Sequence, residues 1–134
     1  KNCPYDVTDI LTAAKKADFL TFHCPLTPQT KGLVNRDILS VMKPSAVLIN
    51  TSRGPVVNEA DLAQALNSEK IAAAYLDVLE KEPMSPDTPL KAAKNCTITP
   101  HTAWAAYETR SRLVDIVCAN IRAWLGGNPQ NKVN

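Results

Sequence analysis

The sequence lacks the features that mark several large classes of protein. Its 15 basic and 13 acidic side chains give a net charge of +2, and the longest basic runs are pairs such as Lys15-Lys16. Nucleic-acid binding needs a basic patch, so the sequence argues against it as the primary role. Charged residues interrupt the apolar stretches and no signal peptide opens the chain. We therefore expect no membrane segment and, by default, a cytoplasmic location.

Cysteine and glycine are both scarce. No pair among the cysteines has C-x-x-C spacing, and no G-x-G-x-x-G occurs among the glycines. We interpret the cysteines as scattered reduced thiols and predict neither a disulfide framework nor a metal site. The missing glycine motif is the loop that receives a dinucleotide pyrophosphate at a helix N-terminus. The four cysteines are Cys3, Cys24, Cys96 and Cys118, and the four glycines are Gly32, Gly54, Gly126 and Gly127.

What is present is an alternation of short apolar runs with helical runs, in 134 residues that are 45% hydrophobic. This length suits one domain with one core. The alternation is typical of parallel βαβ units. The predicted strands are residues 18–22, 46–49, 71–76 and 96–99. A proline-rich segment between the last two strands is predicted to be irregular.

Helix signals fall between these strands. Thr8 is the predicted cap of a helix that ends at Lys16, with an apolar face formed by Ile10, Leu11 and Ala14. Asn35 is the predicted cap of a short helix that reaches Met42. Asn58 is the predicted cap of a third helix, with Asp61 as its capping partner and an apolar stripe of Leu62, Ala65 and Leu66.

The last predicted helix spans residues 105–125. Its apolar residues have helical spacing, and we expect Trp124 to be a core residue. Gly126 stands where a helix C-terminal glycine belongs. The apolar residues are Leu113, Ile116, Val117, Ile121 and Trp124.

Polar residues follow all four predicted strands. Because the carboxyl ends of parallel strands meet at one edge of a sheet, we expect these side chains to converge there, where open α/β sheets bind ligands. They are His23 after the first strand, Thr51 and Arg53 after the second, Asp77 and Glu82 after the third, and His101 after the fourth.

These residue types suit the reduction of a 2-keto acid. Arg53 offers a planar, two-pronged donor for the carboxylate. His101 titrates in the range needed to protonate the carbonyl oxygen as hydride arrives. Glu82 beside His101 would stabilise the imidazolium. Asp77 can accept a hydrogen bond from a nicotinamide carboxamide.

Each residue also has a structural interpretation. Arg53 can be a surface or salt-bridge residue. His23 and His101 can be ordinary loop histidines. Asp77 can cap a turn, and Glu82 can be a solvated surface charge. The joint placement at four strand ends favours the functional interpretation.

Four segments resemble motifs of the D-isomer-specific 2-hydroxyacid dehydrogenase family. They are residues 23–27 (H-x-P-L-T), 50–54 (N-x-S-R-G), 77–83 (D-V-x-x-x-E-P) and 100–101 (P-H). The resemblance covers nearly the whole chain in the family's order. It implies an α/β fold with a parallel-sheet, Rossmann-like, three-layer domain, and NAD as the cofactor, with NADP not excluded.

The resemblance also implies roles. Arg53 would bind the substrate carboxylate and carbonyl, His101 would shuttle the proton, and Glu82 would tune His101. The full-length protein would be a homodimer. The residues implied to contact the cofactor are His23, Cys24, Pro25, Thr51, Ser52, Arg53, Asp77 and His101.

Residues 100–104 and 128–131 are most similar to glycerate dehydrogenases, also called hydroxypyruvate reductases. This similarity implies hydroxypyruvate and D-glycerate as the substrate pair, and places Trp104 near the substrate pocket. A core position is the alternative for Trp104. Glu82 argues against the formate dehydrogenase branch, which has glutamine there.

One departure from the family concerns the cofactor. The family's glycine-rich loop and the acidic residue for the adenosine ribose lie upstream, and the separate substrate domain is absent. The chain also begins at Lys1, without an initiator Met. We therefore expect residues 1–134 to be the C-terminal portion of a NAD(P)-binding domain, truncated, that alone binds dinucleotide poorly and turns nothing over.

Two rival functions remain. An NAD-responsive corepressor on the same scaffold would act through a partner surface, and its cellular role would survive His101→Ala. A receiver-like module would need carboxylates at the end of the first strand, where residues 18–25 offer only Asp18.

Overall fold

The computed structural model describes residues 6–133. Cys3 and Lys1 lie outside the described residues, whereas Cys24, Cys96 and Cys118 are free thiols. The chain divides into a first compact unit that ends at His101 and a second that begins at Thr102. Across the described residues, no helix has both the length and the apolar character needed to cross a bilayer.

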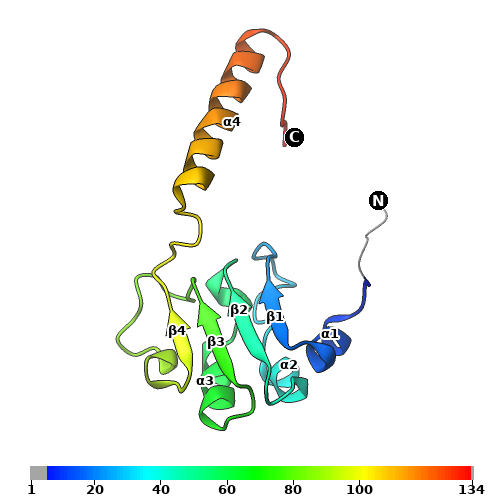
Figure 1. Cartoon of the computed structure of the whole chain (residues 1–134), viewed down its shortest axis with the longest axis vertical. Helices are drawn as coiled ribbons and strands as arrows, with labels where there is room; N and C mark the ends of the chain where they lie inside the picture. The colour runs from blue at the N-terminus through cyan, green and yellow to red at the C-terminus, as the bar shows by residue number, and fades with distance from the viewer. Residues whose placement is uncertain (1–5, 134) are drawn as a thin grey trace. The chain divides into compact units, whose positions relative to one another are not determined.

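The first unit is built on a parallel sheet of four strands in the order β1-β2-β3-β4 (Figure 1). The strands are β1 (Phe19–Phe22), β2 (Val47–Asn50), β3 (Ala73–Leu76) and β4 (Cys96–Ile98). Phe22, Asn50 and Leu76 are register partners at the carboxyl edge, and Leu76 pairs with Ile98. The predicted α/β fold with a parallel sheet is confirmed.

The strand boundaries differ slightly from the predicted ones. Asp18, Ala46 and Ile71 precede the observed strands, Thr99 follows β4, and β2 extends to Asn50. Asp18 nevertheless accepts a backbone hydrogen bond from Val47, at 2.9 Å. The pairing therefore begins one residue before the regular strand. The pattern of apolar residues does not distinguish this first paired residue from the strand itself.

Three helices line up along one face of the sheet: α1 (Ile10–Lys16), α2 (Arg36–Val41) and α3 (Glu59–Asn67). The core between them and the sheet includes the inward residues Leu48 and Ala74, both fully buried, and Leu62 of α3. Two 3₁₀ turns, η1 (Gly54–Val56) and η2 (Pro89–Ala92), lie in the connections. The second of these is regular structure inside the proline-rich segment that we predicted to be irregular.

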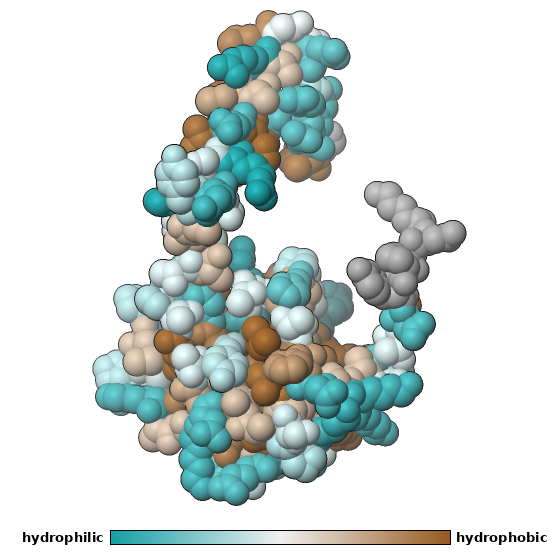
Figure 2. Space-filling view, viewed as in Figure 1, coloured by the Kyte–Doolittle hydropathy of each residue, from teal (hydrophilic) through white to brown (hydrophobic). Residues whose placement is uncertain are grey.

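Side chains alternate along each strand, and those that point away from the helices are less buried than those that face them. Phe19, Thr21, Tyr75 and Thr97 belong to the less buried set. Figure 2 shows hydrophobic side chains over the strands on this face. Residues 6–101 thus supply two of the three expected layers, the sheet and one layer of helices.

Polar caps start the helices of the first unit. Asn35 and Asn58 cap α2 and α3 as predicted, each through its side-chain oxygen. The predicted Thr8 cap of α1 is wrong, because Asp9 accepts the Thr12 N–H at 2.9 Å. Asp61 donates its backbone N–H to Asn58 Oδ1 at 3.1 Å, but its carboxylate does not complete a capping box, because it accepts the backbone N–H of Arg36 on α2.

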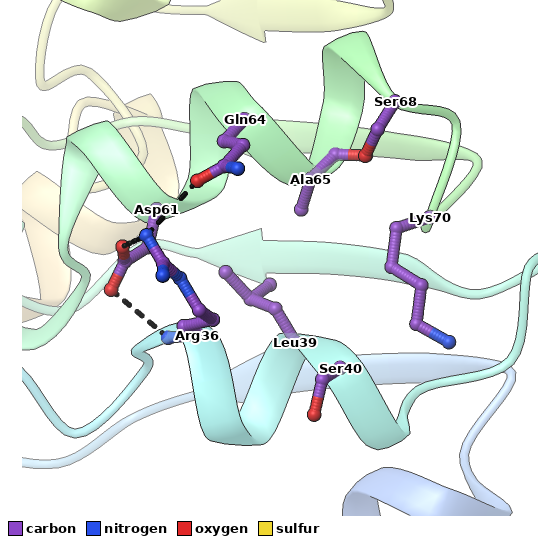
Figure 3. A pocket seen from close by; sticks show the side chains of 8 residues that line it. All are labelled: Arg36, Leu39, Ser40, Asp61, Gln64, Ala65, Ser68 and Lys70. Carbon is purple, nitrogen blue, oxygen red and sulfur yellow. Dashed lines mark hydrogen bonds and ion pairs between the residues drawn. The ribbon is translucent and has the colours of Figure 1, made fainter.

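Helices α2 and α3 are joined by polar contacts around a small pocket (Figure 3). The Arg36 guanidinium donates to Gln64 at 3.1 Å and lies 3.7 Å from the Asp61 carboxylate. The charge of Arg36 is therefore partnered within the helix layer, and we interpret this pocket as part of helix packing.

In α1, Ala14 is buried and Ile10 packs against the core, but Leu11 is 44% exposed, which corrects its predicted place on the apolar face. The reason is that one residue turns a helix by about 100°. Leu11 is consequently rotated away from the stripe that Ile10 and Ala14 share.

The second unit contains α4 (Tyr107–Leu125), which starts two residues later than predicted and has no side-chain cap. The Ala105 N–H bonds to Thr102 in a preceding turn. None of the residues of α4 is buried, and Trp124 is 68% exposed, so its expected core position is wrong. Among the described residues of this unit, α4 is the only regular element, so its apolar stripe has no second surface there to pack against.

The end of α4 is a Schellman turn. Gly126 is the C-cap as expected, but the residue with positive φ is Gly127, at 74°. The N–H groups of Gly127 and Asn128 bond back to Trp124 and Ala123. Glycine is favoured at position 127 because the left-handed conformation is strained for most other residues.

Candidate active site

Two pockets lie at the carboxyl ends of the strands. One, of about 320 Å³, follows β1 and β2, and one of about 570 Å³ follows β3 and β4. The first is lined by His23, Cys24, Pro25, Thr51, Ser52 and Arg53. The second is lined by Asp77, Leu79, Glu82, Pro83, Met84, Ile98, Thr99, Pro100 and His101. Every strand-end residue singled out in the sequence therefore lines one pocket or the other.

The loop that carries Arg53 is organised by Asn50, which is fully buried at the end of β2. Its Oδ1 accepts the Ser52 N–H at 3.0 Å and the Ser52 hydroxyl at 2.9 Å, while its Nδ2 donates to the Arg53 carbonyl at 3.0 Å. A side chain that bonds to its own following backbone shapes a tight turn. Asn50 thereby holds the main chain at Arg53 at the mouth of the first pocket.

The guanidinium of Arg53 is exposed and donates to the Ser52 carbonyl at 2.7 Å. Within residues 6–133, Arg53 forms no salt bridge. The salt-bridge interpretation is therefore not supported by the described structure, and Arg53 lines the first pocket at the strand ends.

Gly54 joins the Arg53 loop to the segment after β3. A Cβ at position 54 would overlap the Leu79 carbonyl group and crowd the Glu80 nitrogen. Only glycine permits this approach of two backbones. The close contact places the Arg53 loop against the segment that carries Glu82.

Glu82 and His101 form the central pair. Glu82 Oε2 lies 2.7 Å from His101 Nδ1, and its Oε1 accepts the Leu79 N–H at 2.9 Å. The Leu79 N–H, and after it the His101 ring, hold the pKa of the Glu82 carboxyl below its ordinary value. Glu82 is thus an ionised acceptor with two fixed donors, which corrects the interpretation of it as a merely solvated charge.

The backbone at His101 has φ 54°, in the left-handed region. Its N–H bonds to the carbonyls of Asp77 at 2.9 Å and Thr99 at 3.0 Å. A non-glycine residue in this conformation is strained and persists where its surroundings enforce it. These two contacts, with Glu82 on the ring, fix both the backbone and the side chain of His101.

Asp77 is buried at the end of β3, with 5% of its surface exposed. Its N–H bonds to the Asn50 carbonyl at 2.9 Å, and its carboxylate accepts the Thr99 hydroxyl. It connects β2, β3 and the residue before Pro100 at the rim.

The segment after β1 is also internally bonded. The Nε2 atom of His23 lies 2.9 Å from the Thr21 hydroxyl oxygen. The Thr30 hydroxyl donates to the Pro25 carbonyl at 2.7 Å. These contacts shape one wall of the first pocket.

Trp104 belongs to the second unit and is 56% exposed, so the core alternative for it is wrong. Its expected place near a substrate pocket stays a prediction.

The motif of residues 50–54 includes Asn50 and Gly54, but sequence reasoning assigned no role to either, and it did not propose Glu59 or Thr99 as site residues. An Asn followed by Thr-Ser at a strand end is a turn signal that indicates Asn50. The contacts of Gly54 and Glu59 have no local signal, because their partners lie more than twenty residues away. In the described part of the chain, no three His, Cys, Asp or Glu side chains group as metal ligands.

A parallel α/β sheet with polar side chains gathered at its strand carboxyl ends places this protein in the Rossmann-like class. Residues 1–103 match the sequence model described as "D-isomer specific 2-hydroxyacid dehydrogenase, NAD binding domain", and the chain belongs to this family.

Individual relatives support the same family assignment. The chain is 48% identical over all its 134 residues to a hydroxypyruvate reductase of Blautia hydrogenotrophica, and it covers 41% of that protein. An NAD-complexed D-isomer specific 2-hydroxyacid dehydrogenase of Lactobacillus delbrueckii superposes with a TM-score of 0.83 at 30% identity, over 95% of this chain and 43% of the other. An NADPH-dependent glyoxylate/hydroxypyruvate reductase of Sinorhizobium meliloti, solved with NADP and malonate, superposes with a TM-score of 0.76 at 40% identity. The match covers 87% of this chain and 36% of the other. The chain thus spans less than half the length of these relatives.

Proposed function

We propose that the full-length protein containing this chain reduces a 2-keto acid to the D-2-hydroxy acid with NAD(P)H, with hydroxypyruvate as the substrate. Residues 1–134 would be the C-terminal portion of its dinucleotide-binding domain. The observation that carries the proposal is the Glu82–His101 contact of 2.7 Å on a segment packed against the Arg53 loop through Gly54.

The residues present fit the nicotinamide end of a dinucleotide. The 570 Å³ pocket has apolar walls, among them Leu79, Ile98 and Pro100, which suit a flat ring, and the buried Asp77 carboxylate can accept from a carboxamide. Residues 23–25 and 51–53 would line the neighbouring part of the cofactor site. No glycine-rich phosphate loop occurs in this sequence.

When bound, NAD(P)H supplies the hydride that adds to the carbonyl carbon. Arg53 binds the substrate carboxylate through two N–H groups and polarises the carbonyl. The His101 ring is oriented through Nδ1 by Glu82, and Nε2 delivers the proton to the carbonyl oxygen as its charge develops. Glu82 stabilises the imidazolium before the transfer, and the products are the hydroxy acid and oxidised cofactor.

The test is the oxidation of NADH and NADPH by the full-length protein, followed by absorbance, with hydroxypyruvate, glyoxylate and pyruvate as substrates. We expect saturable turnover that is fastest with hydroxypyruvate, and D-glycerate as the product on chiral analysis. Absence of turnover with every 2-keto acid, or production of L-glycerate, contradicts the proposal.

A further inference from the structure

One peptide group of the site, between Leu79 and Glu80, is held from two sides. On one side, the Gly54 backbone lies so close to this peptide group that a Cβ at position 54 would not fit between them. On the other, the Glu59 carboxylate of α3 accepts the Glu80 N–H at 2.7 Å. These contacts join three segments that are far apart in the sequence.

The second oxygen of the same carboxylate reaches the far end of the segment. Glu59 Oε2 accepts the Thr88 hydroxyl at 2.7 Å, and Thr88 is the N-cap of η2. Leu90 of η2 is buried, so this end is anchored in the core. One side chain thus ties both ends of residues 80–88, the segment that carries Glu82.

An acidic residue in the first turn of a helix often has a simpler role, because it complements the helix dipole. That role needs no partner outside the helix. Glu59 has two, which are 21 and 29 residues away in sequence, and both donate at 2.7 Å. Charge-assisted hydrogen bonds of this length are strong and directional.

We propose that Glu59 is a positioning residue for the Glu82–His101 pair. It fixes the Leu79–Glu80 peptide and thereby the neighbouring Leu79 N–H, which donates to Glu82 Oε1 at 2.9 Å. The kinetic consequence rests on the proposed function, whereas the effect on the state of Glu82 does not.

The experiment compares Glu59→Ala, Glu59→Gln and Glu82→Gln in the full-length protein, with Asp61→Asn as the matched control. Asp61 lies in the same turn of α3 and also accepts a distant backbone N–H, but both of its carboxylate oxygens are directed to Arg36 of α2. The readouts are kcat and KM for hydroxypyruvate, the pH profile of kcat, and the ¹³C titration of the Glu82 carboxyl in selectively labelled protein.

With Glu59→Ala, we expect kcat to fall by about tenfold to a hundredfold, the scale of a small misplacement of a catalytic group. KM should change by less than about threefold, and the pH profile should move toward that of Glu82→Gln. The pKa of Glu82 should rise toward its ordinary value, because the Leu79 N–H is no longer held in place. Glu59→Gln keeps one acceptor and should be intermediate, and Asp61→Asn should match the parent in all readouts.

The combination Glu59→Ala with Glu82→Gln separates this role from a general loss of stability. If Glu59 acts through Glu82, the double variant is no slower than Glu82→Gln alone. An unchanged Glu82 titration in Glu59→Ala overturns the proposal, as does full additivity in the double variant. If the parent reduces no 2-keto acid, the proposed function fails, and the Glu82 titration still decides the role of Glu59.

Discussion

Glu82 Oε2 lies 2.7 Å from His101 Nδ1, and this contact joins the segment after β3 to the residue after Pro100. Because Nδ1 faces a carboxylate, it carries a proton in both charge states of the ring. Proton transfer to a substrate therefore falls to Nε2. The pair gives the site a donor whose orientation is set before substrate arrives.

Removing the charge of Glu82 should alter the pH dependence of turnover. In Glu82→Gln, the amide can still accept from Nδ1, but it no longer stabilises the imidazolium. We expect the decline of kcat with rising pH to begin at a lower pH than in the parent, with KM little changed. The measurement is kcat between pH 5 and 10, and a superimposable profile contradicts the assigned role.

The lowered pKa of Glu82 also has a consequence for stability. A carboxyl whose folded-state pKa lies below its unfolded value stabilises the fold above that unfolded value and loses this contribution as pH falls through the folded value. The full-length parent should therefore lose stability more steeply below about pH 4.3 than Glu82→Gln. Urea unfolding at several pH values between 3 and 6 measures the difference, and parallel curves would argue against an ionised, bonded Glu82.

Arg53 is expected to act on both binding and turnover. Arg53→Ala should raise KM for the keto acid and lower kcat, because the guanidinium both holds and polarises the substrate. Arg53→Lys should recover only part of the loss, since an ammonium cannot donate in the two-pronged geometry. Steady-state kinetics with hydroxypyruvate distinguish these cases. An Arg53→Ala enzyme with unchanged KM would place the carboxylate site elsewhere.

Gly54 should tolerate no side chain. In Gly54→Ala, the new Cβ would overlap the Leu79–Glu80 peptide, so we expect a loss of about 1–3 kcal/mol of stability together with reduced kcat. Gly126→Ala is the matched control, because its φ is −77° and the nearest atom to its Cβ lies at 3.4 Å. Denaturant unfolding and kcat are the measurements. Equal behaviour of the two variants would show that the close approach is not maintained.

The isolated chain should bind cofactor poorly. Residues 1–134 contain no glycine-rich phosphate loop, so most of the pyrophosphate contacts are missing. Trp104 and Trp124 are both exposed and report on their surroundings through fluorescence. We expect titration with NADH to give no saturable change. Tight, saturable binding would mean that the loop is dispensable or replaced.

Local rules were enough to predict much of the first unit. Alternating apolar runs gave the parallel sheet, and Asn35 and Asn58 were identified as caps because capping depends on a few adjacent residues. The prediction of Thr8 as a cap was wrong because Asp9, one residue later, is an equally good cap. The prediction of Trp124 as a core residue was wrong because periodicity defines a helix face but not whether another surface covers that face.

The candidate site shows the same division. The residues at the rim follow from strand ends and parallel topology, so Arg53, Glu82 and His101 could be proposed together. The positive φ of His101 could not be predicted from the sequence, since it depends on hydrogen bonds to Asp77 and Thr99. Glu59 was missed for a related reason, because its two partners are brought to it only by the packing of α3.

The most direct test of the central claim is the rate of hydride transfer to hydroxypyruvate in full-length His101→Ala, measured by stopped flow in a single turnover. A positioned acid is worth roughly a hundredfold or more, so the rate should fall by at least that factor while NADH affinity is kept. A rate equal to that of the parent would contradict the account and show that His101 does not protonate the substrate.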